Sequence, residues 1–276
     1  MSRSFIWYFR RHPILYKIRF RLLSKRSCRD SIEDFSYNEM NKKTDIPKIY
    51  HELNSLIFKQ LKSEITDLDK AKQIATWLRN NIKGGPGLGK SSATALRKMM
   101  NGEGGVCSDF SQVFNNFCVI NDLKVKEWGL KIMSNDSAIS GGHAFNEVYS
   151  KEFQKWVLID VSKSILFYDV SPGIPLSVFE IVQRKNENHK ISFSSFNDLI
   201  TTENKRINDL YVTSDFSAFV ITNYSNKVYD SYLDKLTFLP ESIIHGLLFL
   251  IGKSYTFEFL KNKENKKESL DHLKKK

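Results

Sequence analysis

The sequence contains few cysteines, and their number and spacing exclude two common uses of this residue. There are three in 276 residues, namely Cys28, Cys107 and Cys118. An odd number without paired spacing argues against a disulfide framework and against a Cys-x-x-Cys metal site. We therefore expect a protein of a reducing compartment, the cytoplasm.

Long hydrophobic runs are also lacking. The longest, Ile243–Gly252, contains His245 and falls well short of the roughly 20 apolar residues that a membrane-spanning helix needs. The first residues, MSRSFIWYFRRHPILYKIRF, interrupt their apolar side chains with arginines and have no small-residue cleavage site. We expect neither a membrane span nor a secretory signal peptide.

Net positive charge is absent from the body of the chain and concentrated at its two ends. Residues 1–30 contribute +8 and residues 261–276 contribute +4 to the total of +11, so the stretch between them carries about −1. This distribution argues against a nucleic-acid-binding groove across the core. We expect no nucleic acid among the partners and a frayed, Lys-rich tail at residues 261–276.

Residues 1–45 are predicted to form a basic amphipathic N-terminal arm. Apolar residues recur at roughly helical spacing from Ile14 to Leu23, with lysines and arginines between them and Trp7 and Tyr8 upstream. Cationic, aromatic-rich helices of this kind lie on anionic membrane surfaces, where each basic residue adds on the order of 1 kcal/mol. A helix packed on the body with a solvated basic face has the same pattern. The sequence does not decide between these two alternatives, peripheral binding to an anionic membrane and packing on the domain.

Residues 84–91, GGPGLGKS, match the phosphate-binding pattern G-x-x-x-x-G-K-[ST]. Such a loop must connect the end of a buried strand to a helix. The preceding residues, KAKQIATWLRNNIK, have a helical period instead and carry too many charges for a buried parallel strand. We therefore predict a loop between two helices, with a nucleotide-binding protein as the weaker alternative.

Cys107 is predicted to begin a helix. After it, Phe110, Val113, Phe114 and Phe117 recur at helical spacing and form an apolar stripe. A thiol at a helix N-terminus meets the positive end of the helix dipole, which favours the thiolate. A single cysteine is more often a small buried residue, but the glycines just before Cys107 leave room for a substrate to approach.

A predicted hairpin brings a histidine and an aspartate together. Residues 143–149 and 155–160 have strand patterns and are separated by a polar loop at residues 150–153. With this four-residue loop, His143 lies directly opposite Asp160, with Cβ atoms about 5 Å apart. A carboxylate in this place would orient the imidazole, although either residue alone is more often structural.

Three segments, GEGGVCSDFSQVFNNF, GGHAFNEVY and WVLIDVS, resemble the transglutaminase-like superfamily, which has a papain-type cysteine core. The resemblance covers roughly residues 65–164. It implies Cys107 as the nucleophile, His143 as the general acid and base, and Asp160 as the residue that orients the histidine. The chain departs from the family pattern at Phe145-Asn146 and at Val161-Ser162, and neither departure removes one of these groups.

These patterns together predict an α+β fold, a papain-like transglutaminase core in which the nucleophile helix packs on an antiparallel sheet. Residues 46–200 are expected to form the catalytic domain and residues 201–260 a C-terminal extension packed on it. We expect a cysteine-dependent enzyme that acts on a peptide or another amide-bearing substrate, as a hydrolase rather than a cross-linker, without cofactor or metal. A noncatalytic membrane-surface module on the same fold is the alternative, and nothing indicates the oligomeric state.

Overall fold

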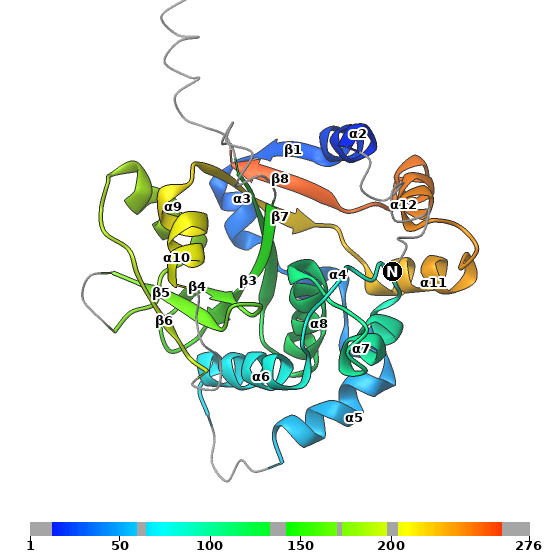
Figure 1. Ribbon diagram of the computed structural model, residues 1–276, viewed down its shortest axis with the longest axis horizontal. Helices are drawn as coiled ribbons and strands as arrows, with labels where there is room; N and C mark the ends of the chain where they lie inside the picture. Colours follow the sequence, from blue (N-terminus) through cyan, green and yellow to red (C-terminus); the bar gives the residue numbers. More distant parts are fainter. Residues whose placement is uncertain (1–12, 60–64, 133–141, 170–172, 198–203, 261–276) are drawn as a thin grey trace, which may run out of the picture.

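The computed structural model describes residues 13–59, 65–132, 142–169, 173–197 and 204–260, with the backbone alone for residues 13–17 (Figure 1). Within these ranges eight strands form one sheet in the order β1-β8-β7-β2-β3-β4-β5-β6. The strands are β1 (Ser24–Ser27), β2 (Val125–Ile132), β3 (Gly142–Ser150), β4 (Lys155–Asp160), β5 (Ile165–Tyr168), β6 (Ser192–Ser195), β7 (Phe216–Thr222) and β8 (Thr256–Leu260). Neighbouring strands are antiparallel except β1 and β8, which run parallel.

Helices cover both faces of this sheet, so the predicted α+β class is confirmed. They are α2 (Pro13–Leu23), α3 (Arg29–Asp34), α4 (Tyr37–Met40), η1 (Lys43–Asp45), α5 (Lys48–Ile57), α6 (Asp67–Asn81), α7 (Ser92–Met100), α8 (Cys107–Ile120), α9 (Val178–Asn186), α10 (Asn204–Ile207), η3 (Asn208–Thr213), α11 (Asn226–Lys235) and α12 (Glu241–Leu250). Among the described residues, none of these helices combines the length and the apolar character needed to cross a bilayer.

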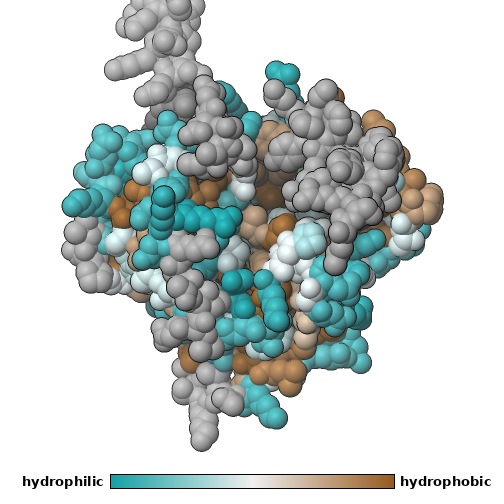
Figure 2. Space-filling view, viewed as in Figure 1, coloured by the Kyte–Doolittle hydropathy of each residue, from teal (hydrophilic) through white to brown (hydrophobic). Residues whose placement is uncertain are grey.

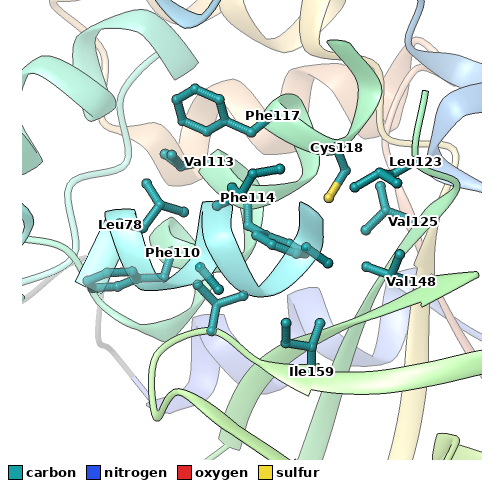
Figure 3. Packing of buried hydrophobic residues seen from close by; sticks show 14 of the residues in the cluster. Leu78, Phe110, Val113, Phe114, Phe117, Cys118, Leu123, Val125, Val148 and Ile159 are labelled. Atoms are coloured by element: carbon teal, nitrogen blue, oxygen red, sulfur yellow. The ribbon is translucent and has the colours of Figure 1, made fainter. Parts of the chain in front are cut away.

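Helix α8 is the centre of the larger hydrophobic core. Its side chains meet Leu78 of α6 and the inner faces of β2, β3 and β4, where Val125, Val148 and Ile159 lie (Figure 3). From Phe110 to Ile120 every residue except Gln112 is buried. Since α8 is buried on nearly all sides, including the polar Ser111, Asn115 and Asn116, its packing fixes the position of its first residue.

Two further clusters complete the packing. On the opposite face of the sheet, Trp128, Phe145 and Phe167 pack with α9 and with Tyr211 of η3. A third cluster joins α2, α11 and α12 near the start of β8, and it includes the fully buried Leu248. The cores of the two sheet faces together hold the central strands in register.

The β3–β4 hairpin forms, but its predicted register was wrong by two residues. Ser150 pairs with Lys155 and Asn146 with Ile159, so the four loop residues are 151–154 instead of 150–153. Gln154 closes the loop with a φ of 51°, in the left-handed region. His143 is therefore not directly opposite Asp160. Since side chains alternate faces along a strand, a shift of two residues keeps both on one face, as diagonal neighbours.

The predicted division into an arm, a catalytic domain and an extension stays a prediction. Strand β1, from residues 1–45, pairs with β8, and β7, from residues 201–260, pairs with β2 in the middle of the sheet. The first twelve residues of the predicted arm and the tail at residues 261–276 lie outside the described residues.

Candidate active site

Cys107 is the first residue of α8 and follows the N-cap residue Val106. The carboxylate of Asp109 closes this end of the helix, because its Oδ2 accepts the backbone N–H of Val106 at 2.9 Å. The Cys107 side chain is half-buried, at the helix end where unpaired N–H groups create a positive potential. The local structure therefore favours ionisation of this thiol.

The structure brings the three residues predicted for the site together. Nε2 of His143, near the start of β3, is 2.6 Å from Oδ2 of Asp160 at the end of β4. The Cys107 thiol forms a hydrogen bond with the same imidazole. Because the ionised carboxylate can only accept, Nε2 carries the hydrogen, which leaves Nδ1 to exchange a proton with sulfur. Contacts thus run without a break from the sulfur through the ring to the carboxylate.

Asp160 is fully buried and accepts hydrogen bonds at both carboxylate oxygens. Oδ1 accepts from the hydroxyl of Ser162 at 2.9 Å and from the backbone N–H of Lys163 at 3.0 Å. Oδ2 accepts from the Tyr211 hydroxyl at 2.9 Å in addition to His143. These donors offset the cost of burying the charge and hold the carboxylate in one orientation.

The pKa values of the three groups shift in directions that favour an ion pair. Burial would raise the pKa of the Cys107 thiol, but the hydrogen bond and the charge of His143 outweigh it and lower this pKa. Burial would lower the pKa of His143, but the charge and hydrogen bond of Asp160 raise it to about 10. Burial likewise opposes ionisation of Asp160, yet the His143 cation and the hydrogen bonds lower the pKa of Asp160. These shifts favour a thiolate beside an imidazolium over the neutral pair.

The other two cysteines lie in different surroundings. Cys118 is fully buried in the core around α8, and burial raises its pKa well above the ordinary value. Cys118 is thus part of the hydrophobic core. Cys28 is exposed, and its hydrogen bond with Ser31 lowers the pKa of its thiol. Of the three, only Cys107 combines partial exposure with a histidine partner.

The GGPGLGKS segment at residues 84–91 joins α6 to α7, so a helix precedes it, as predicted. Its backbone pairs with the glycines that precede Cys107. The N–H of Gly85 donates to the carbonyl of Gly105, and the N–H of Gly105 donates to the carbonyl of Pro86, each at 2.9 Å. The segment therefore supports the loop that leads into α8.

A cleft of about 660 Å³ is lined by Cys107 and His143. Residues 87–90 of the glycine-rich segment form part of its lining. Aromatic side chains from α2 and from the C-terminal strands form another part: Phe20, Phe219, Tyr255 and Phe257. The view in Figure 2 shows a recess lined by hydrophobic residues on this face of the molecule. A cleft of this size and character suits a substrate segment with an apolar side chain.

Glu127, on β2, is a buried acid that also lines the cleft. Its Oε2 accepts a hydrogen bond from the Asn115 amide at 2.9 Å. Burial is the main cause that raises the pKa of Glu127 to about 8, and the nearby charges of Cys107 and Asp109 add to the shift. Glu127 is therefore largely protonated at neutral pH, and it adds little negative charge beside the thiolate.

Four side chains at the site were not predicted: Asp109, Glu127, Ser162 and Tyr211. Local signals existed for two of them. Asp109 is an acid three residues after the N-cap, a position that marks the start of a helix. Ser162 follows Asp160 in an Asp-x-Ser sequence that is typical of a turn. Tyr211 lies fifty-one residues after Asp160 and no local pattern links the two.

Within the described ranges, no group of three or more His, Cys, Asp or Glu residues is arranged to hold a metal ion.

Comparison with known proteins gives one family match. Residues 55–161 match the family model of the transglutaminase-like superfamily. A crystal structure from Cytophaga hutchinsonii, of a protein provisionally named a cysteine protease, is similar at 15% identity with a TM-score of 0.32, over 61% of this chain. The similarity spans 57% of the length of that protein. No curated protein matches the chain. The segment matched by the family model includes Cys107, His143 and Asp160.

Proposed function

Because residues 55–161 of this chain belong to the transglutaminase-like superfamily, we propose that it is a cysteine enzyme that acts on an amide or acyl bond. In this proposal Cys107 is the nucleophile, His143 is the general acid and base, and Asp160 orients His143. The observation that carries it is the unbroken series of contacts from the Cys107 thiol through the imidazole to the Asp160 carboxylate. The substrate is a peptide or another amide-bearing molecule.

The proposed reaction has two halves. The Cys107 thiolate attacks the substrate carbonyl and forms a carbon–sulfur bond, while Nδ1 of His143 holds the proton that left the thiol. As the tetrahedral intermediate collapses, that proton passes to the leaving amine and the carbon–nitrogen bond breaks, which leaves a thioester on Cys107. Water or a second amine then attacks the thioester carbonyl, and Nδ1 of His143 takes the proton of this acceptor. As this second intermediate collapses, the carbon–sulfur bond breaks, the acid or the new amide is released, and the Cys107 thiolate is restored beside the His143 imidazolium.

The charges around the site support the first half of this reaction. The imidazolium of His143 and the N-terminal end of α8 both stabilise the thiolate, so little free energy is needed to form it. Oδ2 of Asp160 fixes the ring so that the other nitrogen points at sulfur. The backbone N–H of Cys107, at the start of α8, is a suitable donor to the oxyanion.

We favour water as the acceptor, and therefore a peptidase or amidase rather than a cross-linker. The sequence has no calcium-site pattern of the kind that the large cross-linking relatives carry. Single-turnover reactions with and without an added primary amine test this choice. A hydrolase releases the acid in both cases, whereas a cross-linker diverts most of the acyl group to the amine.

The test of the nucleophile does not need a known substrate. The experiment uses a Cys28→Ser variant, which lacks the exposed thiol. The rates at which iodoacetamide alkylates the other two cysteines are measured by peptide mass spectrometry. The pH is varied from about 5 to about 10, a range that includes the ordinary pKa of a thiol. We expect Cys107 to react far faster than Cys118 at neutral pH. His143→Ala should slow the reaction of Cys107 at neutral pH and return its pH dependence to that of an ordinary thiol.

Activity profiling of peptide and amide libraries with the wild type and Cys107→Ala then identifies the substrate. Equal and slow alkylation of Cys107 and Cys118, unchanged by His143→Ala, would instead support a noncatalytic module on the same fold.

A further inference from the structure

Helix α12 is apolar on the side that faces solvent. Ile243, Leu247 and Leu250 follow the spacing i, i+4, i+7 and are all exposed, Leu250 to 79%. Ile244 and Leu248 point the other way and are buried in the cluster with α2 and α11. From residue 242 to residue 252 the sequence contains no Lys, Arg, Asp or Glu. A surface helix ordinarily carries polar residues on its solvent side, so this outer stripe requires an explanation.

The apolar surface continues beyond α12. Phe238, in the turn that leads into α12, is 76% exposed, and Ile251 follows the helix with an exposed side chain. On α2, Ile18 and Leu22 are exposed at the spacing i, i+4. We call these two outer stripes together the α12–α2 face. Figure 2 shows hydrophobic side chains gathered along the edge where Figure 1 places α12.

The two helices of the α12–α2 face belong to one packed unit. Leu23, the last residue of α2, shares a hydrophobic cluster with Ile244 and Leu248 of α12. The guanidinium of Arg19 on α2 donates a hydrogen bond to Tyr255, which packs in the same cluster. The outer stripes therefore move together with the body of the protein.

Exposed basic side chains lie close in the sequence to the residues of this face. They are Arg21 at the end of α2, Lys25 and Arg26 on β1, Lys235 at the end of α11 and Lys253 after α12. Nearby acids are fewer, with Asp234 exposed and Glu241 half-buried. An apolar surface with mainly cationic residues near it complements the interface of an anionic bilayer, where the apolar groups enter the acyl boundary and the cations meet lipid phosphates.

A second copy of the chain is a less suitable partner for this face than an anionic membrane. In a two-fold dimer built on the α12–α2 face, the same patch faces itself, so the cationic side chains of the two copies approach each other. The helix is also too short to span a bilayer, because ten residues extend about 15 Å. Its geometry is that of a helix lying on a membrane surface.

We propose that the α12–α2 face docks on an anionic lipid bilayer. Within the predicted arm at residues 1–45 the proposal uses only α2 and β1, and it does not require the enzymatic activity proposed above. Its central contacts are Leu247 and Leu250, and its electrostatic contacts are Arg21, Lys25 and Arg26.

Vesicle sedimentation of the full-length chain tests this proposal. The vesicles contain phosphatidylcholine alone or phosphatidylcholine with phosphatidylserine. We expect binding to the anionic vesicles, and the double variant Leu247→Ser/Leu250→Ser should reduce the partition coefficient about tenfold or more. Replacing Arg21, Lys25 and Arg26 by Gln should weaken binding by roughly fivefold per charge. All variants should keep the thermal stability of the wild type, because these side chains are exposed.

The matched control is Leu56→Ser, which removes a leucine from α5, outside this face, whose exposed fraction of 57% lies between those of Leu247 and Leu250. It should bind like the wild type. An unchanged partition coefficient for Leu247→Ser/Leu250→Ser would overturn the proposal and assign any binding to a part of the chain outside α12. Absence of wild-type binding, or equal binding to neutral vesicles, would also overturn it. So would a dimer, detected by analytical ultracentrifugation without lipid, that the double variant dissociates.

Discussion

The hydroxyl of Tyr211 donates a hydrogen bond at 2.9 Å to Oδ2 of Asp160, the same oxygen that Nε2 of His143 contacts. The rings of Tyr211 and His143 also meet edge to face, with centroids 6.0 Å apart. Tyr211 lies in η3, outside the segment matched by the family model. A residue from the C-terminal part of the chain thus takes part in orienting the histidine.

Tyr211→Phe should lower the rate of Cys107 alkylation at mildly acidic pH by about fivefold, roughly the contribution of one hydrogen bond. The Tyr211 hydrogen bond lowers the pKa of Asp160, so its loss raises that pKa. The carboxylate is then held less firmly, so the His143 cation is less well placed beside the Cys107 sulfur and the pKa of Cys107 rises. The measurement is the pH profile of alkylation, whose acidic limb should move to higher pH.

Tyr50→Phe is the matched control for loss of stability alone. The Tyr50 hydroxyl is buried and donates to the carbonyl of Ser92 at 3.0 Å instead of to Asp160. Its removal should cost about 1 kcal/mol of unfolding free energy and leave the pH profile in place. If Tyr211→Phe changes stability but not the acidic limb, Tyr211 does not position the histidine.

The sequence was sufficient to predict that the three side chains lie together, because its signals are local. Cys107 begins a helix whose apolar periodicity is evident, and the hairpin strands alternate clearly, so His143 and Asp160 could be placed on one face. The register was wrong because Ser150 extends β3 and the left-handed Gln154 closes the loop, which periodicity does not reveal. The prediction survived since a shift of two residues does not change the face.

The remaining features depend on contacts between distant segments. The pairing of β7 with β2, the approach of Tyr211 to Asp160 and the contact of the glycine-rich segment with the loop before α8 join residues far apart in the sequence. No periodicity encodes such contacts. The apolar run at residues 243–252 was visible in the sequence, but its exposure on the surface follows only from the fold.

Glu127→Gln should make the protein more stable at neutral and alkaline pH. Burial raises the pKa of Glu127 from an ordinary value of 4.5 to about 8, so the folded state keeps a proton that the unfolded state loses. The free energy of unfolding therefore falls as the pH rises through this interval, and it stops falling above it. Glutamine has no such proton to lose. The variant should gain on the order of a few kcal/mol over the wild type at pH 8 and little at pH 4.

Urea unfolding at several pH values measures this difference. Glu52→Gln, at an exposed position on α5, is the control. Its free energy of unfolding should change with pH in the same way as that of the wild type. Parallel curves for Glu127→Gln as well would show that Glu127 does not retain its proton in the folded protein.

Mg-ATP should not raise the melting temperature of the wild type or of Lys90→Ala. A phosphate loop needs free backbone N–H groups, whereas those of Gly85 and Leu88 donate to Gly105 and to Asp109. The segment also follows α6 instead of a strand. Differential scanning fluorimetry with and without the nucleotide is the measurement. A rise in melting temperature that disappears in Lys90→Ala would restore the nucleotide interpretation.

Gly104→Ala should both destabilise the protein and slow the reaction of Cys107. Gly104 has a φ of +152°, and an added Cβ would lie 2.4 Å from the carbonyl oxygen of Pro86, which is backbone and cannot move aside cheaply. The two loops must therefore separate, and the loop that leads into α8 shifts with them. We expect a loss of about 2–4 kcal/mol in unfolding free energy and a clear decrease in the alkylation rate at neutral pH.

Gly102→Ala is a control that separates the steric clash with Pro86 from the effect of backbone strain. Gly102 lies in the same loop with a φ of +74°, but nothing lies within 4 Å of the added Cβ. It should cost only the conformational penalty of about 1 kcal/mol and leave the alkylation of Cys107 near the wild-type rate. If both variants lose the same stability and reactivity, the contact with Pro86 does not hold the nucleophile in place, and the glycine-rich segment is merely adjacent to the site.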